Sequence, residues 1–254
     1  MKKKISTSIP LMLILFIGPY LSGCSTLGKI WPFSSNQQKR QELEPVKTEE
    51  KLQKEAIQHF RRGRFILAQE LFQKIKDRYP FSPYAAIAEL RLADCKFFQG
   101  LYEEAIPLYE EFEKLHPTHQ YIPYAIFQIG TCYYRLMATP DRDQTFTHKV
   151  IETFERLLRR YPNSPYSFEA KRRIKVARER LAAHEFVVAK WYIRTGQKKQ
   201  ALFRLKTLLA RYPDTTIARD AQHLQSQLLS SPDGKIAEIE GEASSIWKSL
   251  WPFN

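Results

Sequence analysis

The chain has 254 residues, of which 43% are apolar, and its 40 Lys and Arg outnumber its 27 Asp and Glu to give a net charge of +13. This apolar fraction is too high for a disordered chain, and three cysteines are too few for a small domain held together by disulfides. None of the nine glycines stands in a G-x-G-x-x-G or G-x-x-x-x-G-K spacing, so the sequence predicts no glycine-rich phosphate-binding loop.

The N-terminus has the pattern of a secretory signal peptide. Three consecutive lysines at positions 2–4 precede an apolar stretch from Ile9 to Leu21. A helix that spans a bilayer needs about 20 apolar residues, and this stretch is shorter and contains two prolines. We therefore expect residues 1–23 to be a cleaved signal peptide rather than a membrane span.

The end of this segment, Leu21-Ser22-Gly23-Cys24, resembles the lipobox of bacterial lipoproteins. The resemblance implies cleavage before Cys24 and acylation of this residue with chains such as palmitate, which anchor a protein by burying CH₂ groups in the bilayer. Ser25 stands where an inner-membrane retention signal has Asp, which implies sorting to the outer membrane. The alternative is an ordinary signal peptide with a chance cysteine. Residues 24–47 are then expected to be a polar, lipidated tether.

Four segments further along the chain share one spacing. A glycine and a proline stand seventeen residues apart in three of them, and Thr145 replaces the glycine in the remaining copy. Each copy has a small side chain five residues after its first position and a large one nine residues after it. The bounding pairs are Gly63 and Pro80, Gly100 and Pro117, Thr145 and Pro162, and Gly196 and Pro213. The small residues are Ala68, Ala105, Val150 and Ala201, and the large ones are Phe72, Tyr109, Phe154 and Leu205.

Each feature of this spacing suits a pair of helices joined by a turn. Glycine ends a helix in a left-handed conformation, and proline stops the second helix. Small residues let two helices approach, and a residue four positions further on lies on the same helix face. Further small residues stand before the turns, namely Ala56, Ala93, Ala189 and, in the third copy, Gly130. The sequence therefore predicts an all-α fold.

The pattern resembles the tetratricopeptide repeat, a helix pair with a period of about 34 residues. The prolines are 37, 45 and 51 residues apart here, which implies insertions. We expect a solenoid of about five helix-turn-helix units over residues 48–230, with an unusually long helix from Tyr166 to Arg194. Residues 216–229 have the polar outer face of a capping helix. Residues 231–254 are expected to be a tail, with an amphipathic pattern that is compatible with a helix.

Longer strings resemble one family of repeat proteins. In chain order they are Arg78-Tyr79-Pro80-Phe81-Ser82-Pro83-Tyr84, Asp141-Arg142-Asp143-Gln144, Arg160-Tyr161-Pro162-Asn163-Ser164-Pro165-Tyr166 and His184-Glu185-Phe186-Val187-Val188-Ala189. Together with the lipobox they resemble the BamD family, lipoproteins of the outer-membrane β-barrel assembly machinery. The resemblance covers about residues 48–229 and implies a lipid-anchored protein of the outer membrane that faces the periplasm. It also implies binding to the POTRA region of the barrel-forming subunit BamA and to unfolded barrel precursors, with no cofactor and no bond chemistry.

The resemblance implies a groove for the aromatic-rich C-terminal segment of a precursor. We expect the first helix of each unit to line it, with aromatic contact area for an apolar peptide and arginines for its terminal carboxylate. The expected groove residues are Ile57, Phe60, Arg61, Phe97, Phe98, Phe127, Tyr134 and Arg135. Leu90, Asp94 and Thr131 are expected on the same exposed faces. The alternative is that many of these side chains pack between neighbouring units.

Charge is distributed unevenly along the chain. Residues 156–219 hold seventeen Lys and Arg against four Asp and Glu, whereas residues 89–113 hold two against seven. Such a separation steers the docking of a charged partner. Arg204 stands where the BamD family has an arginine that pairs with an acidic POTRA residue. The residues expected beside it at the BamA-binding surface are Arg194, Lys198 and Lys199.

A basic surface also suits two other ligands. The run from Lys171 to Arg178 is either a solvated face or a contact for anionic lipid headgroups. Nucleic acid binds basic surfaces as well, but an exported protein does not meet it, so we expect no nucleic acid partner.

Several residues that could carry chemistry are predicted to be structural. Cys95 and Cys132 are 37 residues apart, one local repeat period, so they occupy equivalent positions on neighbouring helices. Helix axes about 8–10 Å apart are too distant for a disulfide, and we expect two buried thiols. His116 and His119 lack the further ligands that a metal site requires. The acidic pairs expected in solvent are Glu103-Glu104 and Glu110-Glu111. The sequence therefore predicts neither a metal site nor an enzyme.

The sequence leaves two rival functions open. One is a pilotin-like tetratricopeptide lipoprotein that serves pilus or secretin assembly. The other is a cell-wall enzyme or an activator of one. Co-purified partners separate the first rival from a barrel-assembly lipoprotein, and a peptidoglycan-hydrolysis assay tests the second.

Overall fold

The computed structural model describes residues 48–231. The predicted signal peptide, Cys24 and the tether lie outside the described residues, as does the predicted tail after Ser231. None of the helices in the described range combines the length and the apolar content that crossing a membrane requires.

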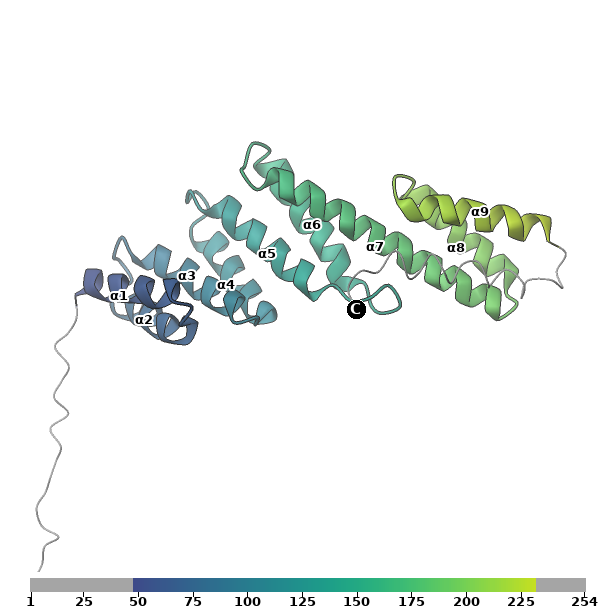
Figure 1. Cartoon of the computed structure of the whole chain (residues 1–254). Helices are drawn as coiled ribbons and strands as arrows, with labels where there is room; N and C mark the ends of the chain where they lie inside the picture. The colour runs from purple at the N-terminus through teal and green to yellow at the C-terminus, as the bar shows by residue number, and fades with distance from the viewer. Residues whose placement is uncertain (1–47, 232–254) are drawn as a thin grey trace, which may run out of the picture. The chain divides into compact units, whose positions relative to one another are not determined.

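The described residues form nine α-helices and no strand, so the predicted all-α fold is confirmed (Figure 1). The first five helices are α1 (Glu49–Arg61), α2 (Phe65–Arg78), α3 (Ala85–Phe98), α4 (Tyr102–Leu115) and α5 (Ile122–Leu136). The remaining four are α6 (Thr145–Arg160), α7 (Ser167–Arg194), α8 (Lys198–Arg211) and α9 (Thr216–Ser230).

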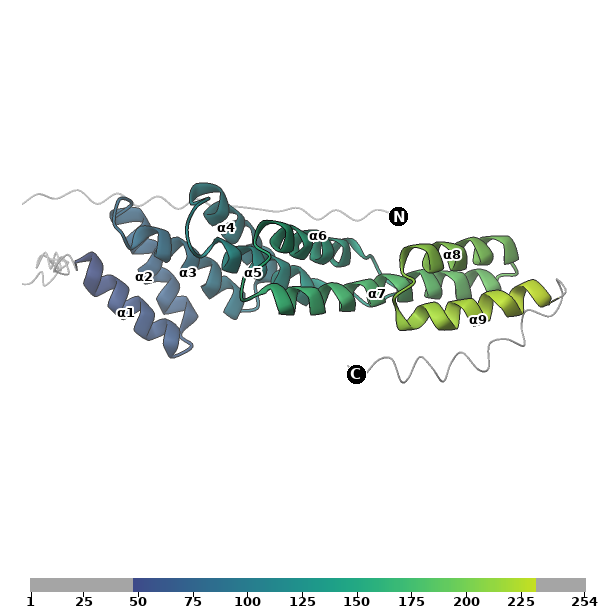
Figure 2. The same ribbon diagram turned by 90° about the horizontal axis from the view of Figure 1, so that it is seen from above.

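Helices that follow one another in the chain pack side by side, as Figures 1 and 2 show. Four complete pairs run from α1–α2 to α7–α8. Helix α9 then packs against both α7 and α8, as the first helix of a further pair would. The described part of the chain thus holds four complete units and one additional helix, where about five units were predicted.

The turns lie where the spacing predicts them. Gly63, Gly100 and Gly196 join the helices of three pairs and have φ angles of 72°, 79° and 72°. Glycine adopts this left-handed conformation without the steric cost that a side chain adds. Helices α2, α4, α6 and α8 each end two residues before the proline that closes the spacing, because the residue that precedes proline disfavours helical geometry.

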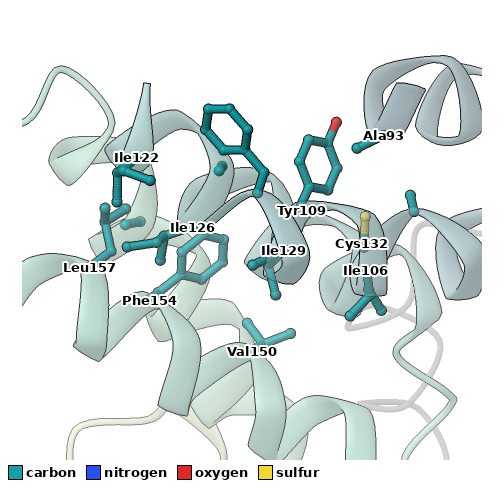
Figure 3. Packing of buried hydrophobic residues seen from close by; sticks show 14 of the residues in the cluster. Ala93, Ile106, Tyr109, Ile122, Ile126, Ile129, Cys132, Val150, Phe154 and Leu157 are labelled. Carbon is teal, nitrogen blue, oxygen red and sulfur yellow. The ribbon is translucent and has the colours of Figure 1, made fainter. Parts of the chain in front are cut away.

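The predicted small and large residues form the contact between paired helices. All of them are buried, and Phe72, Tyr109, Phe154 and Leu205 are 0% exposed. Figure 3 shows this packing around Phe154, where α5 and α6 contribute a run of isoleucine, valine and leucine side chains to one cluster. The small residues allow the helix backbones to approach, and the large ones fill the remaining space.

Helix α7 is the longest helix in the described residues, with 28 residues, and it confirms the predicted long helix. Its first half, through Ala170 and Ala177, belongs to the hydrophobic cluster built by α3 to α6. Its second half, from Leu181 to Ile193, packs in a separate cluster with α8 and α9. One continuous helix therefore holds the last two helices in register with the preceding ones.

We predict that Gly130→Ala destabilises the fold. A Cβ atom at this position would lie 2.5 Å from a ring carbon of Phe154, which is buried and has no room to withdraw. Alanine improves helix propensity by about 1 kcal/mol, but overpacking a core costs about 1–3 kcal/mol. We expect a net loss of about 1 kcal/mol in the free energy of unfolding, measured by urea denaturation.

The double variant Gly130→Ala/Phe154→Leu separates this clash from other effects. It should lose less stability than the sum of the two single variants, because the smaller side chain makes room for the methyl group. A Gly130→Ala variant as stable as the wild type would contradict the close approach.

Candidate protein-binding surfaces

The first candidate surface is an open pocket of about 760 Å³ beside α1, here called the α1 pocket. Ile57 and Arg61, both predicted groove residues, line it together with Lys54, Arg62 and Tyr84. An apolar side chain and an aromatic ring thus lie beside three cationic groups and one carboxylate, that of Glu50. This combination suits an extended peptide that has apolar side chains and a negative charge.

Three more predicted groove residues meet in an aromatic cluster between α1 and α3. The ring centroids of Phe60 and Phe98 are 5.6 Å apart, and those of Phe97 and Phe98 are 5.3 Å apart. Phe65 at the start of α2 stacks on Phe98 at 5.2 Å. Phe98 remains 49% exposed, so the cluster presents one aromatic face to solvent.

The remaining groove residues lie on α5 and form a separate group. The guanidinium of Arg173 on α7 lies 4.9 Å from the ring centroid of Phe127 and 5.2 Å from that of Tyr134. Phe127 also stacks on Tyr166 at 4.9 Å. Both predicted groove residues therefore pack against α7, whereas Arg135 in the last turn of α5 is exposed.

A buried carboxylate connects these two groups. Asp94 on α3 is 0% exposed and accepts hydrogen bonds from the hydroxyls of Tyr109 at 2.6 Å and Tyr124 at 2.8 Å. Arg91 donates to the same carboxylate at 2.7 Å and lies over the ring of Phe60. Burial and the Asp94 charge raise the pKa of both tyrosines, which therefore stay protonated donors.

The expectation that Leu90, Asp94 and Thr131 face a groove is wrong. Leu90 is 2% exposed, Asp94 0% and Thr131 4%. Asp94 is covered from two sides, because it receives one tyrosine partner from α4 of its own pair and the other from α5 of the next pair. Thr131 is covered by Arg173 of α7, which donates to its hydroxyl at 2.6 Å.

The second candidate surface lies on α7 and α8. A pocket of about 370 Å³, here called the α8 pocket, is lined by Lys199, Phe203 and Arg204 with Tyr192 and Gln200. Phe203 is 66% exposed, and the neighbouring Trp191 of α7 is 48% exposed. Exposed aromatic rings beside cationic side chains are typical of the central residues of protein interfaces.

The structure brings together only part of the predicted basic set. Lys199 and Arg204 share the α8 pocket, and Arg204 also forms an ion pair with Glu185 at 3.1 Å. Lys198 instead donates to the backbone carbonyl of Ser231 at 2.7 Å, at the end of α9. Arg194 is exposed at the last residue of α7.

Sequence reasoning missed the aromatic residues of this surface. Phe203 stands four residues after Lys199, so the two lie on one face of α8. That spacing is the signal that could have identified it.

Many charges of the basic segment are neutralised within the fold. At least seven of its arginines form ion pairs, among them Arg156 and Arg160 with Glu113 of the acidic segment, at 2.5 and 2.9 Å. In the Lys171–Arg178 run, Arg172 and Arg173 pair with Glu169, and the Arg172 hydrogen bond helps lower the pKa of that carboxyl to about 2. The charge available to a partner is thus smaller than the composition indicates.

The string that begins at His184 contacts the α5–α6 loop, which also holds the string Asp141-Arg142-Asp143-Gln144. Nδ1 of His184 on α7 lies 2.6 Å from the carbonyl oxygen of Pro140 in the α5–α6 loop. Arg180 donates to the carbonyl of Ala138 in the same loop. The amide of Gln144 closes the loop on itself through the carbonyls of Thr139 and Arg142. These hydrogen bonds hold the α5–α6 loop against the middle of α7.

The residues that could have served a catalytic or metal-binding role lie in surroundings that indicate structural roles instead. Cys95 and Cys132 are free and buried as predicted, and burial raises the pKa of each thiol to about 12, which leaves it protonated and unreactive. Nε2 of His116 lies 2.7 Å from a carboxylate oxygen of Glu89. Within residues 48–231 no group of three or more His, Cys, Asp or Glu is placed to hold a metal ion. The four predicted solvent-facing glutamates are exposed, at positions 103, 104, 110 and 111.

The family match and the curated relatives point to the same kind of protein. Residues 45–230 match the family YfiO, described as an outer membrane lipoprotein. The chain is 27% identical over 215 residues to the outer membrane protein assembly factor BamD of Vibrio cholerae, covering 81% of this chain and 88% of that protein. It is 24% identical to the same factor of Neisseria meningitidis serogroup A, covering 95% of this chain and 94% of that protein. The match to the factor of Caulobacter vibrioides is 26% identical and spans 63% of this chain but about half, 52%, of that protein.

Among solved structures the chain is similar to two TPR proteins. One is the TPR2AB domain of yeast Sti1 in a complex with pHSP90, with a TM-score of 0.42, 17% identity and coverage of 65% of this chain and 64% of that one. The other is a TPR protein of Thermus thermophilus, with a TM-score of 0.39, 16% identity and coverage of 71% of this chain and 98% of that one.

We predict that Asp94→Ala destabilises the fold strongly. The change leaves the buried hydroxyl of Tyr109 without its acceptor and removes the ion pair of Arg91, which together should cost about 2–4 kcal/mol in the free energy of unfolding. Thermal and urea denaturation measure the loss. Asp77→Ala, which removes an exposed carboxylate on α2, serves as the matched control and should cost less than about 0.5 kcal/mol. Equal effects of the two changes would contradict a structural role for the Asp94 network.

Proposed function

Because the chain belongs to the YfiO family of outer membrane lipoproteins, which is the family of BamD, we propose that it is a non-catalytic scaffold of the outer-membrane β-barrel assembly machinery. In this proposal one surface of the helical array docks on the barrel-forming subunit BamA, and a second surface receives unfolded barrel precursors. Acylation of Cys24 anchors the chain to the outer membrane, with the array in the periplasm.

The observation that carries the docking proposal is the α8 pocket. Lys199 offers positive charge beside the 66% exposed ring of Phe203, and Arg204, whose charge Glu185 balances, lines the same pocket. Arg204 is held in place by Glu185, whose side chain is only 13% exposed, so its guanidinium is positioned before a partner arrives. An acidic, partly apolar surface on the POTRA region of BamA would complement both kinds of group.

The α1 pocket and the adjoining aromatic cluster support the second part of the proposal. The C-terminal strand of a barrel precursor is apolar and ends in a carboxylate. Phe98 and Ile57 provide apolar contact area, while Arg61 and Arg62 provide donors for the carboxylate. The Asp94 network fixes α3 against α4 and α5 and so holds Phe97 and Phe98 in position. Phe127, Tyr134 and Arg135 on α5 would extend this surface.

The proposal assigns no reaction to the chain. Its two buried thiols are protonated, and its candidate acidic pairs are exposed and lie apart from any cavity described above. Binding to other proteins accounts for the exposed aromatic and cationic side chains without a catalytic group.

We predict that Lys199→Glu and Phe203→Ala each weaken binding to the soluble POTRA region of BamA. Loss of a central aromatic anchor or reversal of a partner-facing charge should raise the dissociation constant at least tenfold, as measured by calorimetry. Lys206→Glu, an equal charge change on an exposed position of the same helix, should leave the constant within about threefold.

Circular dichroism should show unchanged helix content in all of these variants, since the three side chains lie outside the core. Unchanged affinity in both pocket variants would exclude the α8 pocket as the docking site. Binding to a secretin instead of the POTRA region would favour the pilotin-like alternative.

A further inference from the structure

The turn between α1 and α2 is strongly basic. Arg61, Arg62 and Arg64 are all exposed, and within the described residues none of them forms an ion pair. The first turn of α2 contains no acidic residue that could neutralise them. Three uncompensated positive charges therefore stand at one end of the first helix pair.

Apolar side chains are exposed at the same end. Ile66 and Leu67, in the first turn of α2, are 66% and 44% exposed. Phe98 of α3 is 49% exposed and stacks on Phe65, the first residue of α2. We call the surface made by Arg64, Ile66 and Leu67 the first tip; Arg62 and Phe98, which the proposed function assigns to precursor binding, are not part of it. It puts large apolar groups in water next to an unpaired cation.

The turns at Gly100 and Gly196 differ from the first tip. The turn at Gly100 leads into Glu103 and Glu104 in the first turn of α4, which cancel positive charge there. The turn at Gly196 precedes Lys198 and Lys199, but the first turn of α8 exposes no aliphatic side chain. The pairing of arginines with exposed aliphatic residues thus belongs to the first turn and not to the repeat as such.

We infer that the first tip contacts the surface of a membrane that contains anionic phospholipids. Arginines next to inserting aliphatic side chains such as Ile and Leu are a combination by which interfacial segments bind such membranes. The inference rests on the proposed function, because acylation at Cys24 is what holds the chain at a bilayer. The 24 residues from Cys24 to the start of the described helices can extend to roughly 80 Å, so the anchor permits this contact.

The shape of the first tip favours a bilayer over an acidic protein. Protein partners bind through side chains that fill pockets, and neither of the two pockets described above includes Arg64, Ile66 or Leu67 in its lining. A lipid surface needs no complementary pocket, since acyl chains and headgroups rearrange around the inserted groups.

Vesicle flotation tests the inference. The protein is residues 24–254 with Cys24→Ala, which cannot be acylated at that position and contains the whole helical array. It should float with vesicles of phosphatidylethanolamine and phosphatidylglycerol at a 3:1 ratio, and 0.5 M salt should weaken this binding. Arg64→Glu, and the pair Ile66→Ser/Leu67→Ser, should each lower the apparent affinity about tenfold.

Two matched controls lie elsewhere on the array. Lys74→Glu makes the same kind of charge change at an exposed position further along α2, and Leu229→Ser removes an apolar side chain that is 67% exposed on α9. Both should bind vesicles like the parent chain. The inference is overturned if the parent chain does not float, if the controls lose as much affinity as the tip variants, or if the tip variants lose none.

The POTRA-binding assay separates this inference from the proposed function. The tip variants should bind the POTRA region normally, whereas Lys199→Glu should bind vesicles normally. Loss of POTRA binding in the tip variants, with vesicle binding intact, would identify the first tip as a protein contact and overturn the inference.

Discussion

The close approach of paired helices at one small side chain is the constraint on which the rest of the structure depends. At one of these contacts Gly130 of α5 leaves no room for even a methyl group beside Phe154 of α6. Equivalent alanines and large side chains are buried in the other pairs. Because this contact fixes the register of each pair, it determines which side chains reach the surface and where the turns between helices lie. Both proposed binding surfaces are consequences of that register.

Long-range contacts then convert a row of pairs into one array. Asp94 joins α3 to α4 and α5 through two tyrosine hydroxyls, and Glu113 joins α4 to α6 through two arginines. The continuous helix α7 belongs to two hydrophobic clusters and carries the last two helices with it. A buried carboxylate with three donors resists replacement, since each donor would lose its partner. The α1 pocket and the α8 pocket are therefore held by the same scaffold.

The local pattern of the sequence was sufficient to predict the helices, because turn glycines, helix-ending prolines and small residues act within one pair. It predicted the left-handed glycines, the end of each second helix and the buried cysteines. It was insufficient for Asp94 and Thr131, since their partners Tyr124 and Arg173 stand 30 and 42 residues away. It gave no prediction for Phe203, whose exposure depends on how α8 packs against α7. When the exposed face of a helix is assigned from the sequence of that helix alone, the neighbouring helix that packs over the face in the folded chain is not taken into account.

Photo-crosslinking in intact cells tests the central claim, that one array binds two different proteins. A crosslinking amino acid is placed at Ile57 in the α1 pocket and, separately, at Phe203 in the α8 pocket. The account predicts that the first position captures unfolded barrel precursors and that the second captures the barrel-forming subunit. Capture of a secretin or a peptidoglycan hydrolase at both positions, with no barrel protein at either, would contradict it.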